Sequence, residues 1–271
     1  MLKPIPLFML RAFILTSLLL STPLASAYVW HEQSGIAEVA VDPSTPTTLY
    51  VGTWGSGVFK STDGGLTWTA TPGWGAYNQR DYVNSLAIDP RTPTTIYAGT
   101  NGGVFKSTNG GATWSIAGTT AAVTNLVIHP LTSTTLYAVA PYGDPVLLKS
   151  TDSGVTWIVA RTFTLFGWLW PMSLSNVVID PGTPSAAYIG ANYSICWFCE
   201  MWDWGWAYIE EWGQVFGITD AGATSSDSRV STGVAALAIA PATGPGTGPV
   251  LHAAGQYGGL FNRATAPILS S

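Results

Sequence analysis

The chain has little charge and few side chains suited to metal or redox chemistry. Only 9% of its 271 residues are charged, and it holds two cysteines and three histidines. The cysteines form the motif Cys196-Trp-Phe-Cys199. A structural zinc ion would need two more ligands, and a thioredoxin-like motif would need a strand–helix context that the surrounding sequence lacks. We therefore expect no metal site and no cofactor.

Basic residues are also scarce. Without the first 27 residues the chain has 8 basic and 15 acidic side chains, a net charge of −7. A nucleic-acid-binding protein normally has the opposite sign. The glycines fall in turn-like contexts, and none is followed by the Gly-Lys-Ser/Thr of a phosphate-binding loop. These absences argue against nucleic-acid and nucleotide partners.

Long apolar runs are absent after the N-terminus. Lys3 and Arg11 precede a short apolar run, Ala12–Leu20, and the small residues Ala25-Ser-Ala27 follow it. This order is typical of a secretory signal peptide over residues 1–27, and the run is too short to span a bilayer. We predict an exported protein, periplasmic or extracellular, with no transmembrane span after cleavage.

What the sequence does contain is a repeat. Ser61-Thr-Asp-Gly-Gly-Leu-Thr-Trp68 recurs as Ser107–Trp114 and Ser150–Trp157, with its tryptophans 46 and 43 residues apart. An Asp-Pro or His-Pro turn phrase ending in tyrosine precedes each copy. This period matches a four-stranded propeller blade of roughly 40–50 residues, and each unit alternates short strand patterns with turn signals. The fold class is therefore all-β, a β-propeller of antiparallel four-stranded blades, with residues 28–271 as one domain.

The repeated octapeptide resembles the Asp-box, or BNR, repeat. Proteins with this repeat include sialidases, xyloglucanases, sortilin-type receptors and photosystem II stability/assembly factors, and the wider phrase looks most like the xyloglucanase and photosystem-factor branches. The resemblance implies a turn between the third and fourth strands of each blade. One carboxylate per turn is too few for a calcium loop, so we interpret the box as structural. The box residues are Ser61, Asp63, Gly65, Thr67, Trp68, Ser107, Asn109, Gly111, Thr113, Trp114, Ser150, Asp152, Gly154, Thr156, Trp157 and, in a fourth and decayed copy, Asp220.

Five blades are predicted. The fourth unit keeps Asp220 but lacks the tryptophan, and a fifth has strand patterns without a box. Tyr28-Val-Trp30 resembles a fourth strand separated from its box. We expect this segment to complete the last blade, because a closed ring leaves no unpaired strand edge.

Aromatic residues mark one end of the predicted propeller. Loops between the second and third strands, and from each blade to the next, open on the end opposite the boxes. In enzymes of the resembled fold that end carries the active site. The aromatic residues predicted there to bind ligand are Trp54, Trp74, Tyr77, Tyr142, Trp168, Trp170, Trp197, Trp202, Trp204, Trp206 and Tyr257.

The largest of these loops is a tryptophan-rich insertion over residues 191–214, which also holds Trp212. It is either a platform for sugar rings or for a protein partner, or a hydrophobic plug that caps the ring. Both interpretations stay open. In an exported protein a disulfide between Cys196 and Cys199 is favoured over free thiols.

The sequence favours a non-catalytic binding or scaffold module whose aromatic end recognises a glycan or a protein partner. The alternatives are a glycoside hydrolase and a photosystem assembly factor-like protein. The Arg-Ile-Pro motif of sialidases is absent, and xyloglucanases have two large propellers where this chain has room for one. Hydrolysis commonly needs two carboxyl groups about 5–10 Å apart. Candidates on the aromatic end are Asp81, Asp144, Glu200, Asp203, Glu210, Glu211 and Asp227, none in a recognisable catalytic motif.

Overall fold

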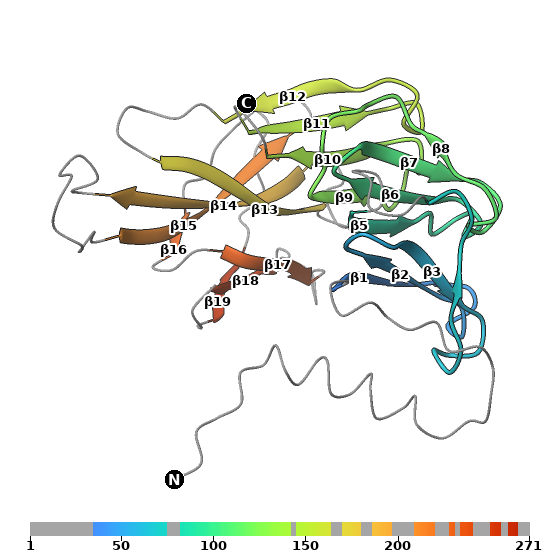
Figure 1. Cartoon of the computed structure of the whole chain (residues 1–271). Helices are drawn as coiled ribbons and strands as arrows, with labels where there is room; N and C mark the ends of the chain where they lie inside the picture. The colour runs from blue at the N-terminus through green and yellow to red at the C-terminus, as the bar shows by residue number, and fades with distance from the viewer. Residues whose placement is uncertain are drawn as a thin grey trace, which may run out of the picture.

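The computed structural model describes residues 35–74, 82–141, 145–163, 170–179, 186–196, 209–219, 228–230, 234–240, 250–255 and 260–264. The regular structure in these ranges consists of β-strands arranged in five antiparallel sheets that follow one another along the chain (Figure 1). No helix within these ranges is long and apolar enough to cross a membrane.

The first three sheets correspond to the three complete repeats. The first contains β1 (Ile36–Val41), β2 (Leu49–Thr53), β3 (Gly57–Ser61) and β4 (Thr69–Ala70). The second contains β5 (Val83–Ile88), β6 (Ile96–Thr100), β7 (Gly103–Ser107) and β8 (Ser115–Ile116). The third contains β9 (Asn125–Ile128), β10 (Leu136–Ala140), β11 (Val146–Ser150) and β12 (Ile158–Thr162).

The last two sheets come from the decayed repeats. The fourth sheet contains β13 (Trp170–Ile179), β14 (Ala186–Cys196), β15 (Ile209–Thr219) and β16 (Ser228–Val230). The fifth contains β17 (Val234–Ala240), β18 (Val250–Gly255) and β19 (Leu260–Ala264). The strand predicted to complete it, Tyr28–Trp30, lies outside the described residues.

The hydrophobic core lies between successive sheets. Tyr50 and Val58 of the first sheet pack with Val83 and Leu86 of the second, and similar clusters join the later pairs. The sheets approach so closely that a Cβ added to Gly52 would lie 2.6 Å from Val83 Cγ1. Gly99 in the second sheet is equally confined, 2.8 Å from Val123 Cγ1 by the same measure, so a larger residue at either position would force the sheets apart.

The turn after each third strand is held by its own side chains. Ser61 Oγ donates to Asp63 Oδ1 at 2.7 Å, and that oxygen accepts the Thr67 backbone N–H at 2.9 Å. Asn109 accepts the corresponding N–H of Thr113, also at 2.9 Å. An aspartate or an asparagine therefore serves equally as a turn acceptor, which supports a structural role.

Two of the box tryptophans bridge neighbouring sheets. Trp114 Nε1 donates to Thr71 Oγ1, 3.2 Å away in the segment after β4, and Trp157 Nε1 donates to the Ala117 carbonyl at 2.8 Å. Trp68 instead donates to Gly65 in its own turn, at 3.0 Å. The indoles of the second and third repeats thus fasten each sheet to the one before it.

The predicted insertion over residues 191–214 is not a loop throughout. Strands β14 and β15 continue into it, and their pairing runs from Ala186↔Thr219 to Cys196↔Ile209. Residues 191–196 and 209–214 are therefore the outer part of a long hairpin. The sequence failed to indicate this because the density of tryptophan and cysteine hid the strand pattern. Residues 197–208, Cys199 included, lie outside the described part of the chain.

Candidate functional site

The antiparallel connections separate the turns onto two ends of the sheets. The box turn touches the turn between the first two strands of the same sheet, as in the bond from Gly64 N to the Thr47 carbonyl, 2.8 Å. At the opposite end, Trp54 in the turn after β2 pairs with Tyr82 just before β5. The loop end and the box end are thus distinct, as the predicted strand order requires.

Two aromatic side chains are exposed together on the loop end. Trp54 is 44% exposed and Tyr82 is 36% exposed. Trp54 N donates to the Gly35 carbonyl at 2.9 Å, and a Cβ at Gly35 would lie 2.8 Å from the indole, so one edge of the ring rests on backbone. A Cβ on Gly55 would lie 4.0 Å from the Tyr82 ring. The rings are anchored at their base and remain accessible.

Two asparagines lie close to this pair in the strands, Asn84 at the start of β5 and Asn101 in the turn after β6. Asn84 Nδ2 donates to Asn101 Oδ1 at 2.8 Å and to the Val123 carbonyl at 2.9 Å. Asn101 N in turn donates to the Tyr82 carbonyl at 3.2 Å. We call Trp54, Tyr82, Asn84 and Asn101 the aromatic–amide cluster. Flat apolar faces next to fixed amides are a chemistry that binds sugar rings or peptide groups.

One carboxyl group lies near this cluster. Glu38 is in β1, where it pairs with Gly52, and its neighbour Ile36 pairs with Thr53, the residue before Trp54. Glu38 is half-buried, and burial raises the pKa of its carboxyl group above the usual value. A raised pKa suits a proton donor, and such carboxyl groups gather at functional sites.

In the later sheets, the residue equivalent to Glu38 joins the first strand of its sheet to the first strand of the next sheet. Asn125 Oδ1 accepts the Val177 N–H at 2.9 Å, and Asn176 Nδ2 donates to the Leu237 carbonyl at 3.3 Å. The registers place Ser85, Asn125, Asn176 and Glu38 at equivalent points of their sheets. Sequence reasoning missed Glu38 because it considered carboxylates in loops only.

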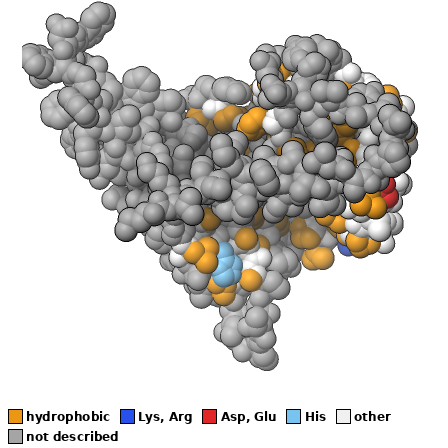
Figure 2. Space-filling view, turned by 60° about the horizontal axis from the view of Figure 1, so that its bottom comes forward, with side chains coloured by type: hydrophobic (Ala, Val, Ile, Leu, Met, Phe, Trp, Pro, Cys, Tyr) orange, Lys and Arg blue, Asp and Glu red, His pale blue; other side chains and the backbone are white. Residues whose placement is uncertain are grey.

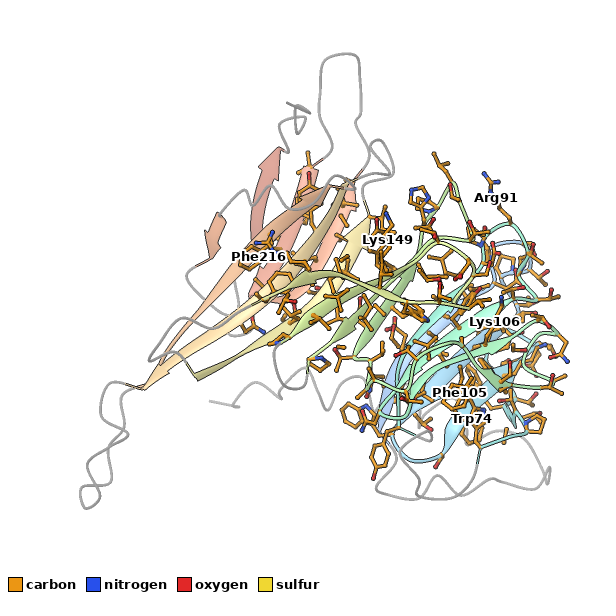
Figure 3. All side chains as sticks on the ribbon, turned by 90° about the horizontal axis from the view of Figure 1, so that it is seen from above. Trp74, Arg91, Phe105, Lys106, Lys149 and Phe216 are labelled. Atoms are coloured by element: carbon orange, nitrogen blue, oxygen red, sulfur yellow. The ribbon has the colours of Figure 1, made fainter. Side chains whose placement is uncertain are left out.

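Trp74, predicted as a ligand residue, is packed between the first two sheets. Its ring lies 5.6 Å from Phe105 and 5.3 Å from Trp114, measured between centroids, and its Nε1 donates to Thr71 Oγ1 at 2.9 Å. Figure 3 shows Trp74 and Phe105 close together. The engaged N–H and the two ring contacts give Trp74 a packing role here.

Most other predicted site residues cannot be placed in the site. Trp170 lies in β13, and Glu210, Glu211 and Trp212 lie in β15, and only the backbone of these four residues is described. Tyr77, Asp81, Tyr142, Asp144, Trp168, Trp197, Glu200, Trp202, Asp203, Trp204, Trp206, Asp220, Asp227 and Tyr257 lie outside the described residues. Of the predicted set, Trp54 alone is an exposed aromatic residue among those whose side chains are described.

Tyr82, Asn84 and Asn101 were not predicted as site residues. Their local signals were those of a strand start and a hairpin turn, and only the pairing between the first two sheets brings them to Trp54. Across the part of the chain that the structure covers, no group of three or more His, Cys, Asp or Glu side chains could hold a metal ion.

Comparison with known proteins identifies the fold. An ancestral GH74 enzyme aligns with a TM-score of 0.55 at 15% identity, covering 84% of this chain and 38% of that chain. YCF48 from Cyanidioschyzon merolae aligns with a TM-score of 0.53 at 14% identity, covering 88% of this chain and 69% of that chain. An auxiliary nutrient binding protein from Bacteroides thetaiotaomicron aligns with a TM-score of 0.51 at 12% identity, covering 84% of this chain and 56% of that chain. No family model and no curated protein matches the sequence. The chain is thus an all-β propeller of antiparallel four-stranded sheets that spans well under half of the GH74 enzyme it matches.

Proposed function

We propose that this protein is an exported, non-catalytic binding module whose loop end recognises a glycan. The observation that carries the proposal is the aromatic–amide cluster, where two exposed rings lie beside two hydrogen-bonded amides. Among the described residues, the Asn101 side-chain nitrogen makes no hydrogen bond and can donate to a ligand. The proposal includes a five-bladed ring and export through residues 1–27.

A sugar fits this cluster for physical reasons. The C–H faces of a pyranose stack on aromatic rings, and its hydroxyl groups exchange hydrogen bonds with amides. Glu38 is a described carboxyl group in the strand beside the cluster, and Lys60 and Lys106 donate to carbonyl groups at the opposite end of their sheets. A neutral sugar residue of the glycan therefore suits this cluster better than an anionic one.

The test is a glycan array with the chain from residue 28 onward, followed by calorimetry on each hit. Trp54→Ala should weaken binding by about 1–3 kcal/mol, as removal of an aromatic hot spot does. Trp68→Ala is the matched control, because that indole bonds to its own turn at the box end. Equal affinity in wild type and Trp54→Ala, or equal losses in both variants, would contradict the proposal. Capture of a protein with no glycan bound would favour the scaffold alternative.

A glycoside hydrolase is the second candidate, and Glu38 is the observation that favours it. Burial raises the pKa of that carboxyl group, as expected of a general acid. The other described acidic side chains near turns, Asp42, Asp63, Asp89 and Asp152, belong to the box end, so none supplies the second carboxyl group. Release of reducing sugar by wild type, abolished in Glu38→Gln with binding retained, would establish hydrolysis.

A further inference from the structure

The interface between the third and fourth sheets contains a cation enclosed by aromatic rings. The Cζ atom of Arg161, in β12, lies 5.2 Å from the ring centroid of Phe163 and 5.5 Å from that of Phe216 in β15. The two phenylalanine rings are 5.3 Å apart in an edge-to-face arrangement, and both are buried. Figure 3 labels Phe216 on the side of the molecule away from Trp74.

This cation lacks a partner for one of its nitrogens. Nη1 of Arg161 is buried and has no hydrogen-bond partner. Stacking on aromatic rings stabilises a guanidinium, but a buried N–H donor without an acceptor costs a comparable or larger free energy. The position is therefore unfavourable for the free protein unless an acceptor arrives from elsewhere.

Packing between sheets does not require a cation at this place. Arg161 pairs with Leu147 of β11. In the first two sheets the corresponding residues are Thr71 and Ala117, whose backbone N–H groups donate to the carbonyls of Val58 and Val104. Thr71 and Ala117 each accept the indole N–H of the next box tryptophan. The next box after Arg161 has Ser225 in place of that tryptophan. A residue as small as alanine would therefore be enough for packing between the sheets at this position, but the chain has an arginine.

We propose that Arg161 binds the carboxylate of an acidic sugar, a uronic acid within the glycan. The step rests on the proposed function and adds a second binding position, at the interface between the third and fourth sheets. Arginine matches a planar carboxylate with two parallel hydrogen bonds, and the phenylalanine rings offer apolar surface to the sugar ring. Lys60 and Lys106 donate to carbonyl groups at the box end, Lys149 lies over the Tyr137 ring, and Arg91 is in the turn between β5 and β6. Arg161 differs from them in having a buried nitrogen without a hydrogen-bond partner.

Arg161 is half-buried as a residue, so part of its side chain is exposed, whereas Nη1 itself is buried. Binding of a carboxylate therefore requires a change in the side-chain torsions of Arg161 that exposes Nη1.

Calorimetry with a galacturonic acid oligosaccharide and its neutral galactose counterpart tests the proposal. The chain from residue 28 is compared with Arg161→Met, Arg161→Lys and Trp54→Ala. We expect Arg161→Met to weaken uronate binding at least tenfold, to leave neutral binding unchanged and not to lower the melting temperature, because an unpaired buried charge is removed. Arg161→Lys should restore binding only in part, since lysine lacks the planar fork.

Several results would overturn it. One is a wild-type protein that binds uronate no more tightly than the neutral sugar. Another is a lower melting temperature in both Arg161→Met and Asp144→Asn, which would make Asp144 the internal partner of Arg161. A third is Arg161-dependent binding of a peptide with a free C-terminus and not of uronate. Loss of neutral-sugar binding in Trp54→Ala, but not in the Arg161 variants, would support the proposed function on its own. Binding of the uronate without binding of the neutral sugar would support the role of Arg161 and refute that of the aromatic–amide cluster.

Discussion

The Tyr97 hydroxyl donates a hydrogen bond to the backbone carbonyl of Ser153, 3.1 Å away, and so joins the second sheet to the box turn of the third. Lys106 Nζ donates to the same oxygen at 3.1 Å and lies 5.2 Å from the Tyr97 ring centroid. Tyr50 and Lys60 repeat this arrangement on Gly110. The tyrosine of the Asp-Pro phrase and the lysine of the third strand thus act together on the next sheet.

Tyr97→Phe should destabilise the protein by about 0.5–1.5 kcal/mol, because it removes one buried hydrogen bond and little packing. Urea unfolding followed by tryptophan fluorescence measures this change. Tyr50→Phe is the matched variant at the preceding interface and should behave alike. A stability equal to wild type in both would show that the lysines alone maintain these contacts.

Ser153→Gly should stabilise the protein by about 0.5–1 kcal/mol. Ser153 has a φ of 61°, in the left-handed region where Gly64 and Gly110 stand in the other two box turns, at 75° and 67°. A side chain there is strained, and glycine relieves the strain at a smaller entropic cost. Gly110→Ser is the reciprocal control and should lower stability by a similar amount. A destabilised Ser153→Gly would mean that the serine hydroxyl contributes more than its backbone strain costs.

The box carboxylates predict a loss of stability in acid. Hydrogen bonds from Thr67, then Ser61, lower the pKa of Asp63 to about 2, and bonds from Thr156, then Ser150, do so for Asp152. Because the folded pKa lies below the unfolded value, this stabilisation is present above about pH 4 and is lost as the pH falls toward 2.

Melting temperatures from pH 6 to pH 2 check this prediction. The double variant Asp63→Asn, Asp152→Asn should lose less stability over that range than wild type, because Asn109 already serves the same turn without titrating. A double variant with the same pH dependence as wild type would assign the acid sensitivity to other groups.

Glu38 predicts the opposite dependence on pH. Burial raises its pKa in the folded state, so the folded protein binds this proton more tightly than the unfolded chain and stability declines as the pH rises through that range. Glu38→Gln should therefore be more stable than wild type at pH 7 and nearly equal to it at pH 4. Equal stability at both values would show that the carboxyl group is solvated.

Much of the fold was predictable because the repeat places local signals at fixed intervals. The period of the tryptophans indicated the first three sheets, and Asp63, Asn109 and Asp152 act as turn acceptors, as the pattern suggested. The outer part of the β14–β15 hairpin, residues 191–196 and 209–214, was not predicted as strands, since its pairing depends on the partner strand and not on local propensity.

The site was predictable only in part. Trp54 could be assigned to the loop end from strand order alone. Tyr82 and Asn84 could not, because the isolated bridge between Trp54 and Tyr82 joins two sheets and leaves no sequence signal. In the sequence nothing distinguishes Arg161 from the other arginines. Its position against Phe216 and the missing partner of its Nη1 are visible only in the structure.

The two end sheets expose side chains that the other sheets bury. Val39 in β1 is 49% exposed, whereas its counterparts Leu86, Leu126, Val177 and Leu237 are buried. Leu260 in β19 is 65% exposed, whereas Val58, Val104 and Leu147 are fully buried at that point of their sheets. Figure 2 shows hydrophobic side chains reaching the surface on the face that comes forward. Complementary apolar faces at the two ends of the row favour a ring in which the fifth sheet packs on the first.

Val39→Asp tests this closure. If the faces meet within one molecule, the charge is buried and the protein should lose about 2 kcal/mol or more while remaining monomeric by light scattering. Val155→Asp is the control, since Val155 is 68% exposed in a box turn and should tolerate the change. Deleting residues 28–32, which hold the predicted closing strand, should lower the melting temperature by several degrees. If the wild type is a dimer that Val39→Asp dissociates, the two apolar faces belong to a contact between two copies of the chain. If Val39→Asp is a monomer as stable as wild type, the row of sheets is open, because replacing an exposed valine by aspartate changes the stability little.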